Sequence, residues 1–318
     1  MDHQIFSPKP DNPLGPWDVA IIGSGPAGLT AAIYTTRGAS STILFGGEIW
    51  GGQLMLTTNV DNFPSQPGIL GPELMGKMRE HSVMFGAEFL EKSVTGVDVN
   101  KSPFEITVSG QIYTAKSVII STGARTKWLD IPSLSKLIGR GVSSCAPCDA
   151  PFFKDKKVAV VGGGDSAMEE ALVLTKYALE VTMIHRRDTF KASVAMQKKV
   201  LSDPKIKVLW NTEVTDVVGE QKLEKVLLKN SVNGEQSELV ADGLFVAIGH
   251  EPETMIFKGK IDLDERGYVV AKDKTKTSVD GIFVAGDVED HTYKQAITAS
   301  AFGCMAAMDT LKYLQEKK

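Results

Sequence analysis

The feature that most constrains the fold is a pattern that occurs twice: an apolar run, a glycine-rich turn and a helix. The first copy has an apolar run at residues 18–22, GSGPAG at 23–28 and a predicted helix over 29–37. The second has an apolar run at 157–161 and GGGDSA at 162–167, before a further predicted helix. This order places a pyrophosphate against backbone N–H groups at a helix N-terminus. We therefore predict an α/β protein with two Rossmann-like, three-layer dinucleotide-binding domains.

The acidic residue expected to bind the ribose in the first copy is not clearly present. The second strand of this copy, residues 41–45, ends in Gly46, Gly47 and Glu48. An NAD-type site carries a carboxylate near this point. The sequence leaves two possibilities, that Glu48 binds the ribose or that no residue takes this role.

The second copy carries arginines where the first carries glycines. The strand predicted at residues 180–184 ends in His185, Arg186 and Arg187. Arginine at this point is typical of sites that bind the 2′-phosphate of NADP, so this half is predicted to bind NADP(H). The alternative is a solvated basic pair. His185 is predicted to support the phosphate site or to pack, rather than to act in catalysis.

A CxxC motif lies between the two copies. Cys145 and Cys148 are two of only three cysteines, and Asp149 follows directly. A disulfide that closes so small a ring restricts the unfolded chain by only about 2 kcal/mol, which favours reversible redox chemistry over a stabilising role. Two alternatives are a zinc site, which needs four ligands although only Cys304 remains, and a pair of incidental buried thiols.

Composition limits the classes of partner. A chain of 318 residues is expected to form two domains. A net charge of −4 gives no reason to expect nucleic acid or an anionic membrane surface, and no apolar stretch could span a bilayer. Residues 1–17 contain four prolines and predict an extended arm without a signal peptide. Few cysteines and no targeting segment indicate the cytoplasm, and a mitochondrial or plastid address is left open.

The remaining segments complete the predicted sheets. A helix is expected at 70–85 and another at 297–315, with the strands or strand groups at 95–108, 117–121, 208–240, 243–248 and 281–286. Asn233-Gly234 predicts a hairpin turn within the third group. Asp287 ends the last strand, where it could bind the ribitol or phosphate chain of a cofactor or cap a helix.

Two nucleotide turns 139 residues apart, counted from Gly23 to Gly162, imply two dinucleotides. Two nicotinamides would be redundant, whereas a flavin and NADPH can pass an electron pair to a disulfide. Because the arginines assign NADPH to the second copy, FAD is assigned to the first.

These motifs together resemble the low-molecular-weight thioredoxin reductases from residue 18 onward. The resemblance is carried by GSGPAG, GGQL at 51–54, CAPCD at 145–149, GGGDSA, HRRD at 185–188, AIGH at 247–250, and GD with KQA between 286 and 296. It implies an FAD domain made of residues 18–127 and 252–318, with the NADPH domain, residues 128–251, inserted and carrying the dithiol. It also implies a homodimer, thioredoxin as the protein substrate, and a domain rotation during turnover.

The resemblance also implies residue roles. Cys148 would face the flavin, Cys145 would attack the disulfide of thioredoxin, and Asp149 would serve as acid and base. Hinges are expected at Gly123-Ala124 and at residues 249–252. No metal is expected. The residues predicted to bind FAD are Gly23, Ser24, Gly25, Pro26, Ala27, Gly28, Gly46, Gln53, Asn62, Val94, Gly123, Asp287, Lys294, Gln295 and Ala296, and those predicted to bind NADPH are Gly162, Gly164, Asp165, Ser166, Ala167, His185, Arg186, Arg187 and Lys191.

The chain departs from the family pattern at two cations and leaves rival functions open. Lys294 stands where the family often has arginine and keeps the charge without the planar fork. Lys191 likewise replaces an arginine of the 2′-phosphate site, so a weaker preference for NADPH over NADH is expected. The rivals are a ferredoxin-fed disulfide reductase, a dithiol oxidase acting on small molecules, and a non-catalytic nucleotide-binding relative. The larger glutathione-reductase type is disfavoured by length and by the lack of a C-terminal His-Pro pair.

Overall fold

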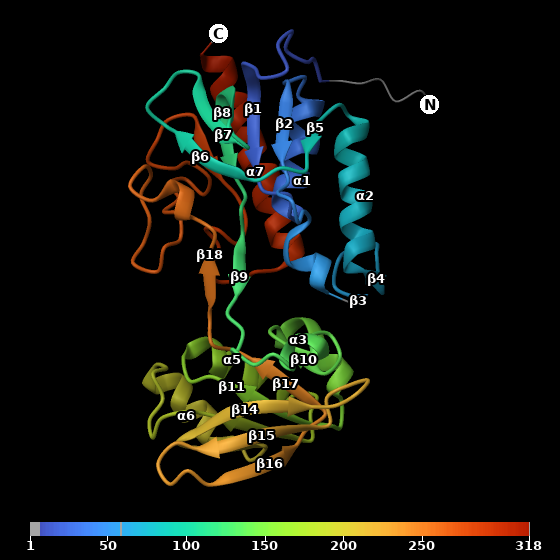
Figure 1. Cartoon of the computed structure of the whole chain (residues 1–318), viewed down its shortest axis with the longest axis vertical. Coiled ribbons are helices and arrows are strands. Elements are labelled where there is room, and N and C mark those ends of the chain that lie inside the picture. The colour runs from blue at the N-terminus through green and yellow to red at the C-terminus, as the bar shows by residue number, and fades with distance from the viewer. Residues whose placement is uncertain (1–6, 58, 318) are drawn as a thin grey trace. The chain divides into compact units, whose positions relative to one another are not determined.

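The computed structural model describes residues 7–57 and 59–317, which form two compact units (Figure 1). One unit contains the described residues up to Arg125 and those from Glu251 onward, and the other contains Thr126–His250. The second unit is therefore inserted into the first. The chain crosses between them at two points, each within two residues of the domain limits given above.

A seven-stranded sheet forms the middle of the first unit, in the order β5-β2-β1-β8-β7-β6, with β19 also paired to β8. Strands β5, β2, β1, β8 and β19 are parallel, whereas β6, β7 and β8 pair antiparallel. The strands are β1 (Trp17–Ile22), β2 (Thr42–Phe45), β5 (Glu88–Leu90), β6 (Val94–Asp98), β7 (Phe104–Val108), β8 (Gln111–Ile120) and β19 (Ile282–Val284).

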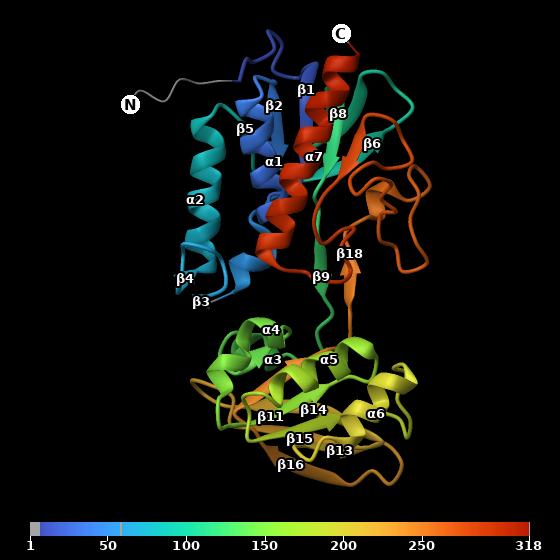
Figure 2. The same cartoon turned by 180° about the vertical axis from the view of Figure 1, so that it is seen from behind.

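The first unit has three layers because successive side chains of β1 point to opposite faces. Val19 and Ile21 pack with helices α1 (Pro26–Arg37), α2 (Gly71–Met84) and α7 (Ala296–Glu316). Ala20 and Ile22 belong to the core cluster on the other face, which includes side chains of β7. Figure 2 shows α1 and α7 side by side on the helical face. Short elements complete the unit: η1 (Gly52–Leu56), β3 (Asn59–Val60), β4 (Ile69–Leu70) and η3 (Met255–Phe257).

The contact between α1 and α7 requires a glycine. A Cβ on Gly303 of α7 would lie 2.1 Å from the carbonyl oxygen of Ala27 in α1. Gly303→Ala is therefore expected to lower the free energy of unfolding by about 1–3 kcal/mol. Gly76→Ala in α2 is the control, because a Cβ there meets no atom within 4 Å, and it should stabilise by about 0.5–1 kcal/mol. Urea denaturation of both variants measures the difference, and equal effects would contradict the prediction.

The segment predicted as an extended arm contacts the rest of the first unit at several of its described residues, although most of them are exposed; residues 1–6 lie outside the described range. Ser7 Oγ donates a hydrogen bond to the Ser40 carbonyl (2.8 Å), and the Leu14 carbonyl accepts one from Thr114 N–H (2.8 Å). Trp17 is only 2% exposed and is the first residue of β1. The sheet therefore begins one residue earlier than predicted, because the indole belongs to the core.

The second unit repeats the three-layer plan with a parallel sheet in the order β10-β17-β11-β12-β13. Val158 and Val160 of β11 pack in the core cluster with α5, while Ala159 packs in the cluster with the antiparallel sheet β14-β15-β16. Figures 1 and 2 show these two faces in turn. The elements are α3 (Leu134–Leu137), β10 (Val142–Ser143), α4 (Ala146–Asp149), η2 (Ala150–Phe153), β11 (Lys157–Val161), α5 (Asp165–Leu174), β12 (Glu180–Ile184), α6 (Val194–Ser202), β13 (Ile206–Leu209), β14 (Thr212–Val218), β15 (Lys225–Asn230), β16 (Gln236–Val240) and β17 (Gly243–Val246).

The two chain crossings lie in paired strands, β9 (Ala124–Thr126) and β18 (His250–Pro252). Gly123 and Gly249 precede these strands with φ of +72° and +108°, and a Cβ on either would meet no atom within 4 Å. Backbone conformation rather than packing therefore favours glycine at both positions. Among the described residues, none of the helices combines the length and the apolar character needed to cross a membrane.

Candidate active site

Glycine occupies the three positions of the first turn for different local reasons. Gly23 has a φ of +112°, and a Cβ there would lie 2.2 Å from the Ser121 carbonyl oxygen. A Cβ on Gly28 would lie 2.0 Å from the Gly23 carbonyl oxygen. Gly25, the N-cap of α1, has no atom within 4 Å of such a Cβ. Protein packing thus requires the outer two glycines, whereas the middle one leaves the N-terminus of α1 open to a phosphate.

The second turn divides its roles in the same way. A Cβ on Gly162 would approach the Ala247 carbonyl oxygen to 2.4 Å and the methyl group of Ala167 to 2.6 Å. Gly164 is the N-cap of α5 and again has no atom within 4 Å of an added Cβ. Two independent turns therefore leave a helix N-terminus accessible at the same motif position.

Ser24 ties the first turn to the end of β2. Its buried hydroxyl donates to the Gly46 carbonyl (2.8 Å) and accepts from Gly51 N–H (2.8 Å). Pro26 is the first residue of α1, and Ala27 lies close to Gly286. The first turn, the β2 end and the turn after β19 thus meet at one edge of the first unit.

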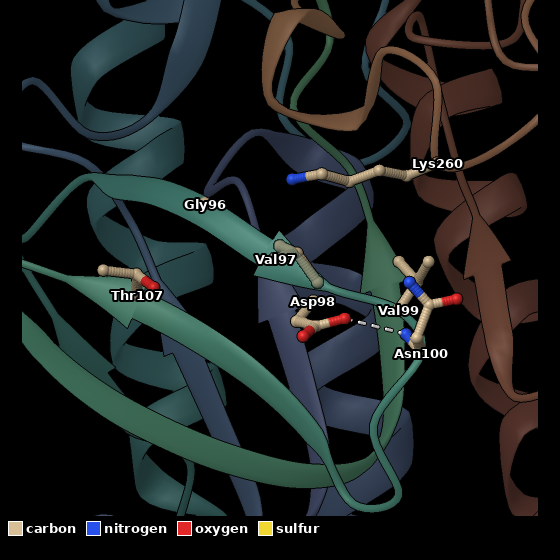
Figure 3. Close-up of a pocket in the computed structure, with 7 residues that line it drawn as sticks. All are labelled: Gly96, Val97, Asp98, Val99, Asn100, Thr107 and Lys260. Carbon is tan, nitrogen blue, oxygen red and sulfur yellow. Dashed lines mark hydrogen bonds between the residues drawn. The ribbon is translucent and has the colours of Figure 1, made fainter.

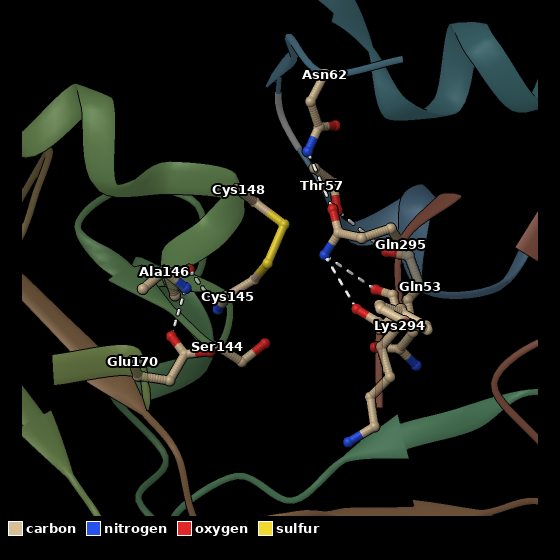
Figure 4. The surroundings of a disulfide bond; sticks show 12 residues. Gln53, Thr57, Asn62, Ser144, Cys145, Ala146, Cys148, Glu170, Lys294 and Gln295 are labelled. Atoms are coloured by element: carbon tan, nitrogen blue, oxygen red, sulfur yellow. Dashed lines mark hydrogen bonds between the residues drawn. A yellow bond between two sulfur atoms is a disulfide. The ribbon is translucent and has the colours of Figure 1, made fainter. Parts of the chain in front are cut away.

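The start of α7 brings together residues far apart in the sequence. Asn62 Nδ2 donates to Gln295 Oε1 at 3.1 Å across 233 positions (Figure 4). Gln295 is the N-cap of α7 and Ala296 its first residue. Lys294 has a φ of +48°, and its N–H donates to Asp290 Oδ2 (3.2 Å).

Two residues predicted to bind FAD, Gln53 and Val94, are only partly buried or exposed. Gln53 lies exposed on η1, where its carbonyl accepts a hydrogen bond from Thr57 Oγ1 at 3.3 Å. Val94 begins β6 and packs, half-buried, against the core cluster. Neither has a direct contact with the glycine turn among the interactions of the described residues.

Asp287 is a buried carboxyl group at the same edge. Its Oδ1 and Glu289 Oε2 are the buried side-chain atoms of the described residues that lack a hydrogen-bond partner. Burial, and then the negative charge of Asp290, raise the pKa of Asp287 to about 7, while Lys294 acts in the opposite direction. Burial and Asp290 also raise the pKa of Glu289 to about 7. An unpartnered buried carboxylate fits a ligand that brings hydroxyl donors.

His185 holds the second turn in place through contacts of its ring. Its ring is buried, with Nδ1 3.0 Å from the Gly162 carbonyl oxygen and Nε2 2.9 Å from that of Thr189. Phe190 and Trp210 lie against it, at centroid distances of 5.1 and 6.0 Å. Both ring nitrogens are occupied by the protein, so His185 positions the turn instead of presenting a nitrogen to a ligand.

The basic loop after β12 is fixed to the second turn by its backbone. Lys191 N–H and Ala192 N–H donate to the Gly163 carbonyl at 2.8 and 3.1 Å. The Asp165 carboxylate accepts from Ser193 N–H (2.9 Å) and Ser193 Oγ (2.7 Å), and these bonds lower the pKa of Asp165. Asp165 therefore anchors the loop, a role that the sequence did not suggest.

The cationic side chains of this loop are exposed. Arg186, Arg187 and Lys191 all face solvent, and within residues 7–57 and 59–317 none of them forms an ion pair. Ser166 is exposed in the first turn of α5, next to Ala167, which is buried. Three unpaired cations thus stand beside an open helix N-terminus, which suits a phosphate group.

The two cysteines of the CxxC motif form a disulfide in the second unit. Cys145 and Cys148 are joined, with their Cα atoms 5.3 Å apart, and both are half-buried. The Cys145 carbonyl accepts from Cys148 N–H (3.3 Å) and Asp149 N–H (3.1 Å), which closes the single turn α4. Asp149 is half-buried at the end of this turn. The predicted catalytic residues therefore lie within one short helical turn.

Glu170 is a polar contact of this turn that the sequence analysis missed. Its carboxylate, carried by α5, accepts a hydrogen bond from Ala146 N–H (Figure 4). On the other side, Ser143 Oγ accepts from Cys145 N–H at 3.1 Å. Since Ala146 is fully buried, the backbone between the cysteines is held, while Cys145 and Cys148 are each only half-buried. The only sequence signal for this contact was that Glu170 is a carboxylate one helical turn after Ala167.

Two cavities of the described residues lie away from these turns. One of about 420 Å³ is lined by Glu220, Gln221, Lys222 and Glu224. Another of about 340 Å³ is lined by Gly96, Val97, Asp98, Val99, Asn100, Thr107 and Lys260 (Figure 3). Neither includes a predicted site residue.

Comparison with known proteins indicates the same class of protein as the sequence motifs do. The model of the pyridine nucleotide-disulphide oxidoreductases matches residues 17–303. A thioredoxin reductase of Streptomyces clavuligerus is 50% identical over 301 residues, covering 93% of this chain and 94% of the relative. The solved thioredoxin reductases of Giardia duodenalis and Streptococcus pyogenes superpose with TM-scores of 0.91 and 0.90 at 42% and 36% identity, each over 94% of this chain and 99% and 98% of theirs.

The chain belongs to the pyridine nucleotide-disulphide oxidoreductases, a family whose members use a flavin and a pyridine nucleotide. Within that family it is of the low-molecular-weight thioredoxin reductase type, as the motifs indicate and as the full-length similarity confirms.

Proposed function

We propose that the protein reduces the disulfide of thioredoxin with electrons from NADPH, using FAD bound to the first unit. The observation that carries the proposal is the Cys145–Cys148 disulfide, closed within one helical turn of a unit that also presents a nucleotide turn. Relatives named thioredoxin reductase at 50% and 47% identity over most of the chain support the same substrate.

The first unit is proposed to hold FAD. Gly25 would admit the pyrophosphate at the N-terminus of α1, and the unpartnered Asp287 Oδ1 would accept a hydroxyl of the ribitol chain. Asn62, Lys294 and Gln295 line the start of α7 at the same edge. When bound, FAD would supply two-electron transfer between the nicotinamide and the disulfide.

The second unit is proposed to bind NADPH. Arg186, Arg187 and Lys191 would hold the 2′-phosphate, with Gly164 at the pyrophosphate. Lys191 offers a point charge where arginine would offer a planar fork. The preference for NADPH over NADH is therefore proposed to be weaker than an arginine at position 191 would give.

The dithiol is proposed to act in the following order. Opening the Cys145–Cys148 bond consumes two electrons and two protons, and Asp149 is the proposed proton carrier. The Cys145 thiolate would then attack the thioredoxin disulfide, forming a mixed disulfide and releasing one thioredoxin thiolate. Attack by Cys148 on Cys145 Sγ would release the second thiolate and re-form the bond. The two protons taken up when the bond opened would pass to the two thioredoxin thiolates, so electrons and protons balance.

The proposal includes a rotation of the two units about the paired crossings, a homodimer, and a cytoplasmic location. Positive φ angles at Gly123 and Gly249 support hinges there, because glycine allows large changes of backbone torsion. A chain with only three cysteines suits a reducing compartment.

The raised pKa of the buried Asp287 carboxyl group makes the stability of the flavin-free protein depend on pH. The pKa of this group rises from 3.8 to about 7 on folding, so the folded state binds the extra proton between these values. Stability should therefore fall as pH rises through this window, by about 1.4 kcal/mol per pH unit for one proton. Asp287→Asn removes this proton. The difference in free energy of unfolding between parent and variant should decline from pH 4 to 7 in chemical denaturation, and a constant difference would contradict the prediction.

The test of the function uses the purified full-length protein. It should be yellow with a flavin spectrum, be bleached rapidly by NADPH without ferredoxin, and then reduce added thioredoxin, as a chromogenic disulfide reports. Bleaching only with reduced ferredoxin would favour the ferredoxin-fed alternative. Bleaching without transfer to thioredoxin would favour a small-molecule partner, and a colourless protein that cannot be reloaded with FAD would overturn the proposal.

A further inference from the structure

A stack of one cation and two aromatic rings borders the end of β2 in the first unit. The Arg79 guanidinium of α2 lies 4.1 Å from the ring centroid of Phe89 and 4.7 Å from that of Trp50. The two rings meet edge to face, with centroids 5.8 Å apart and planes at 82°. Arg79 Nη2 also contacts Glu91 Oε1 at 2.6 Å. Contacts from three directions thus fix the guanidinium.

The stack touches the turn that follows β2. A Cβ on Gly46 would lie 2.6 Å from the ring of Phe89 and 3.3 Å from Cβ of Trp50. Gly46 N–H also donates to the Leu90 carbonyl (2.8 Å), one residue beyond Phe89. Gly46 therefore has to be glycine because the Phe89 ring and the Trp50 Cβ atom occupy the space of a side chain.

The same turn is tied to the first glycine motif. The Ser24 hydroxyl bonds to the Gly46 carbonyl and to Gly51 N–H, each at 2.8 Å, so both ends of the segment that carries Trp50 are held by one residue of the motif. Trp50 is half-buried and packs against the core cluster of the helical face. Its position is thus coupled to the turn that would receive a pyrophosphate.

In a strand, glycine turn, helix and strand unit, the ribose of the adenosine half lies at the end of the second strand. In this unit that strand is β2, which ends at Phe45. Glu48 is exposed there, and its N–H donates to Ser93 Oγ at 3.4 Å. Between this strand end and Gly51, Ile49 is exposed to solvent, and Trp50 is the aromatic side chain, on whose surface a purine or ribose can pack.

We propose that Trp50 forms a wall of the site for the adenosine half of FAD and that Arg79 is a positioning residue, which acts by holding the indole. The inference rests on the proposed assignment of FAD to the first unit. Removing Arg79 leaves Glu91 at the surface, with half of its side chain exposed, so the substitution strands no buried charge.

The experiment equilibrates the full-length protein with FAD and measures free flavin by fluorescence. Trp50→Leu is expected to raise the dissociation constant for FAD about tenfold, and Arg79→Met about fivefold. Trp50→Phe, which keeps a ring, should lose less. The control is Arg37→Met, which removes a guanidinium 5.4 Å from the Phe85 ring on the same unit and should change the constant by less than about twofold.

Competition with ADP separates a ligand contact from a structural role. ADP carries the adenosine half alone, so its inhibition constant against FAD should rise in Trp50→Leu by the same factor as that of FAD. An unchanged constant for ADP, or FAD affinity equal to that of the parent in both Trp50→Leu and Arg79→Met, would overturn the inference. Failure of the unmodified protein to bind FAD would instead overturn the proposed function.

Discussion

Cys148→Ser is expected to abolish NADPH-driven reduction of thioredoxin. The structure joins Cys148 to Cys145 in a disulfide, and a single remaining thiol can neither accept an electron pair nor release a mixed disulfide. The loss should be at least about three orders of magnitude, as when an essential nucleophile is removed. Turnover measured with thioredoxin and a chromogenic disulfide checks the prediction, and Cys145→Ser should behave alike.

Two controls make this result specific. Cys304 is the remaining cysteine, a free thiol on α7 in the first unit, and Cys304→Ser should keep nearly all activity. NADPH-dependent reduction of ferricyanide should survive in Cys148→Ser, because that reaction bypasses the dithiol. Activity with thioredoxin that is retained in Cys148→Ser would refute the proposed electron route.

The sequence predicted those parts of the fold that depend on neighbouring residues. Both glycine turns are local structures, and their geometry explains the glycines through contacts within a few residues or with the adjacent strand. β12 has the predicted bounds, and the Asn233-Gly234 hairpin joins β15 to β16. Helix ends were predicted less well. The sequence predicts a helix over 168–177, whereas α5 begins at Asp165 and ends at Leu174, because backbone bonds from residues 175–178 form a turn there.

Contacts between distant residues could not be predicted in the same way. Asn62 and Gln295 are 233 positions apart, and their hydrogen bond depends on α7 returning to the edge that the first turn occupies. Ser24 is predicted to bind FAD, and its hydroxyl bonds to Gly46 and Gly51, two partners that the motif does not indicate. Asp165 similarly binds Ser193. A motif fixes the residue types at a site but not the partner that each polar group takes.

The helix α6 was missed for a related reason. Residues 194–202 contain five apolar residues among nine, yet of these Val200 alone is buried. The helix has only nine residues and is held by contacts with α5 and β13, and so short a helix depends on tertiary packing that a local pattern does not show. This helix follows the basic loop directly, and its start at Val194 explains why Ser193 is placed to reach Asp165.

Replacing Arg186 and Arg187 together by alanine should raise KM for NADPH about a hundredfold, because two charge-assisted contacts to phosphate are lost. KM for NADH, which lacks the 2′-phosphate, should change by less than about threefold. Both side chains are exposed and without ion pairs among the described residues, so the fold should tolerate the change. Steady-state kinetics with each nucleotide give the ratio.

The matched control for the arginines is a double substitution of exposed lysines on α6 in the same unit, Lys198→Ala with Lys199→Ala. It removes the same charge without touching the loop, so a long-range effect of net charge would appear in both variants and would weaken with added salt. A rise confined to the arginine variant and to NADPH places the 2′-phosphate beside β12. Equal rises for the two nucleotides would remove Arg186 and Arg187 from the site, and Lys191, whose backbone is bonded to Gly163, would be the remaining cation of this loop to test.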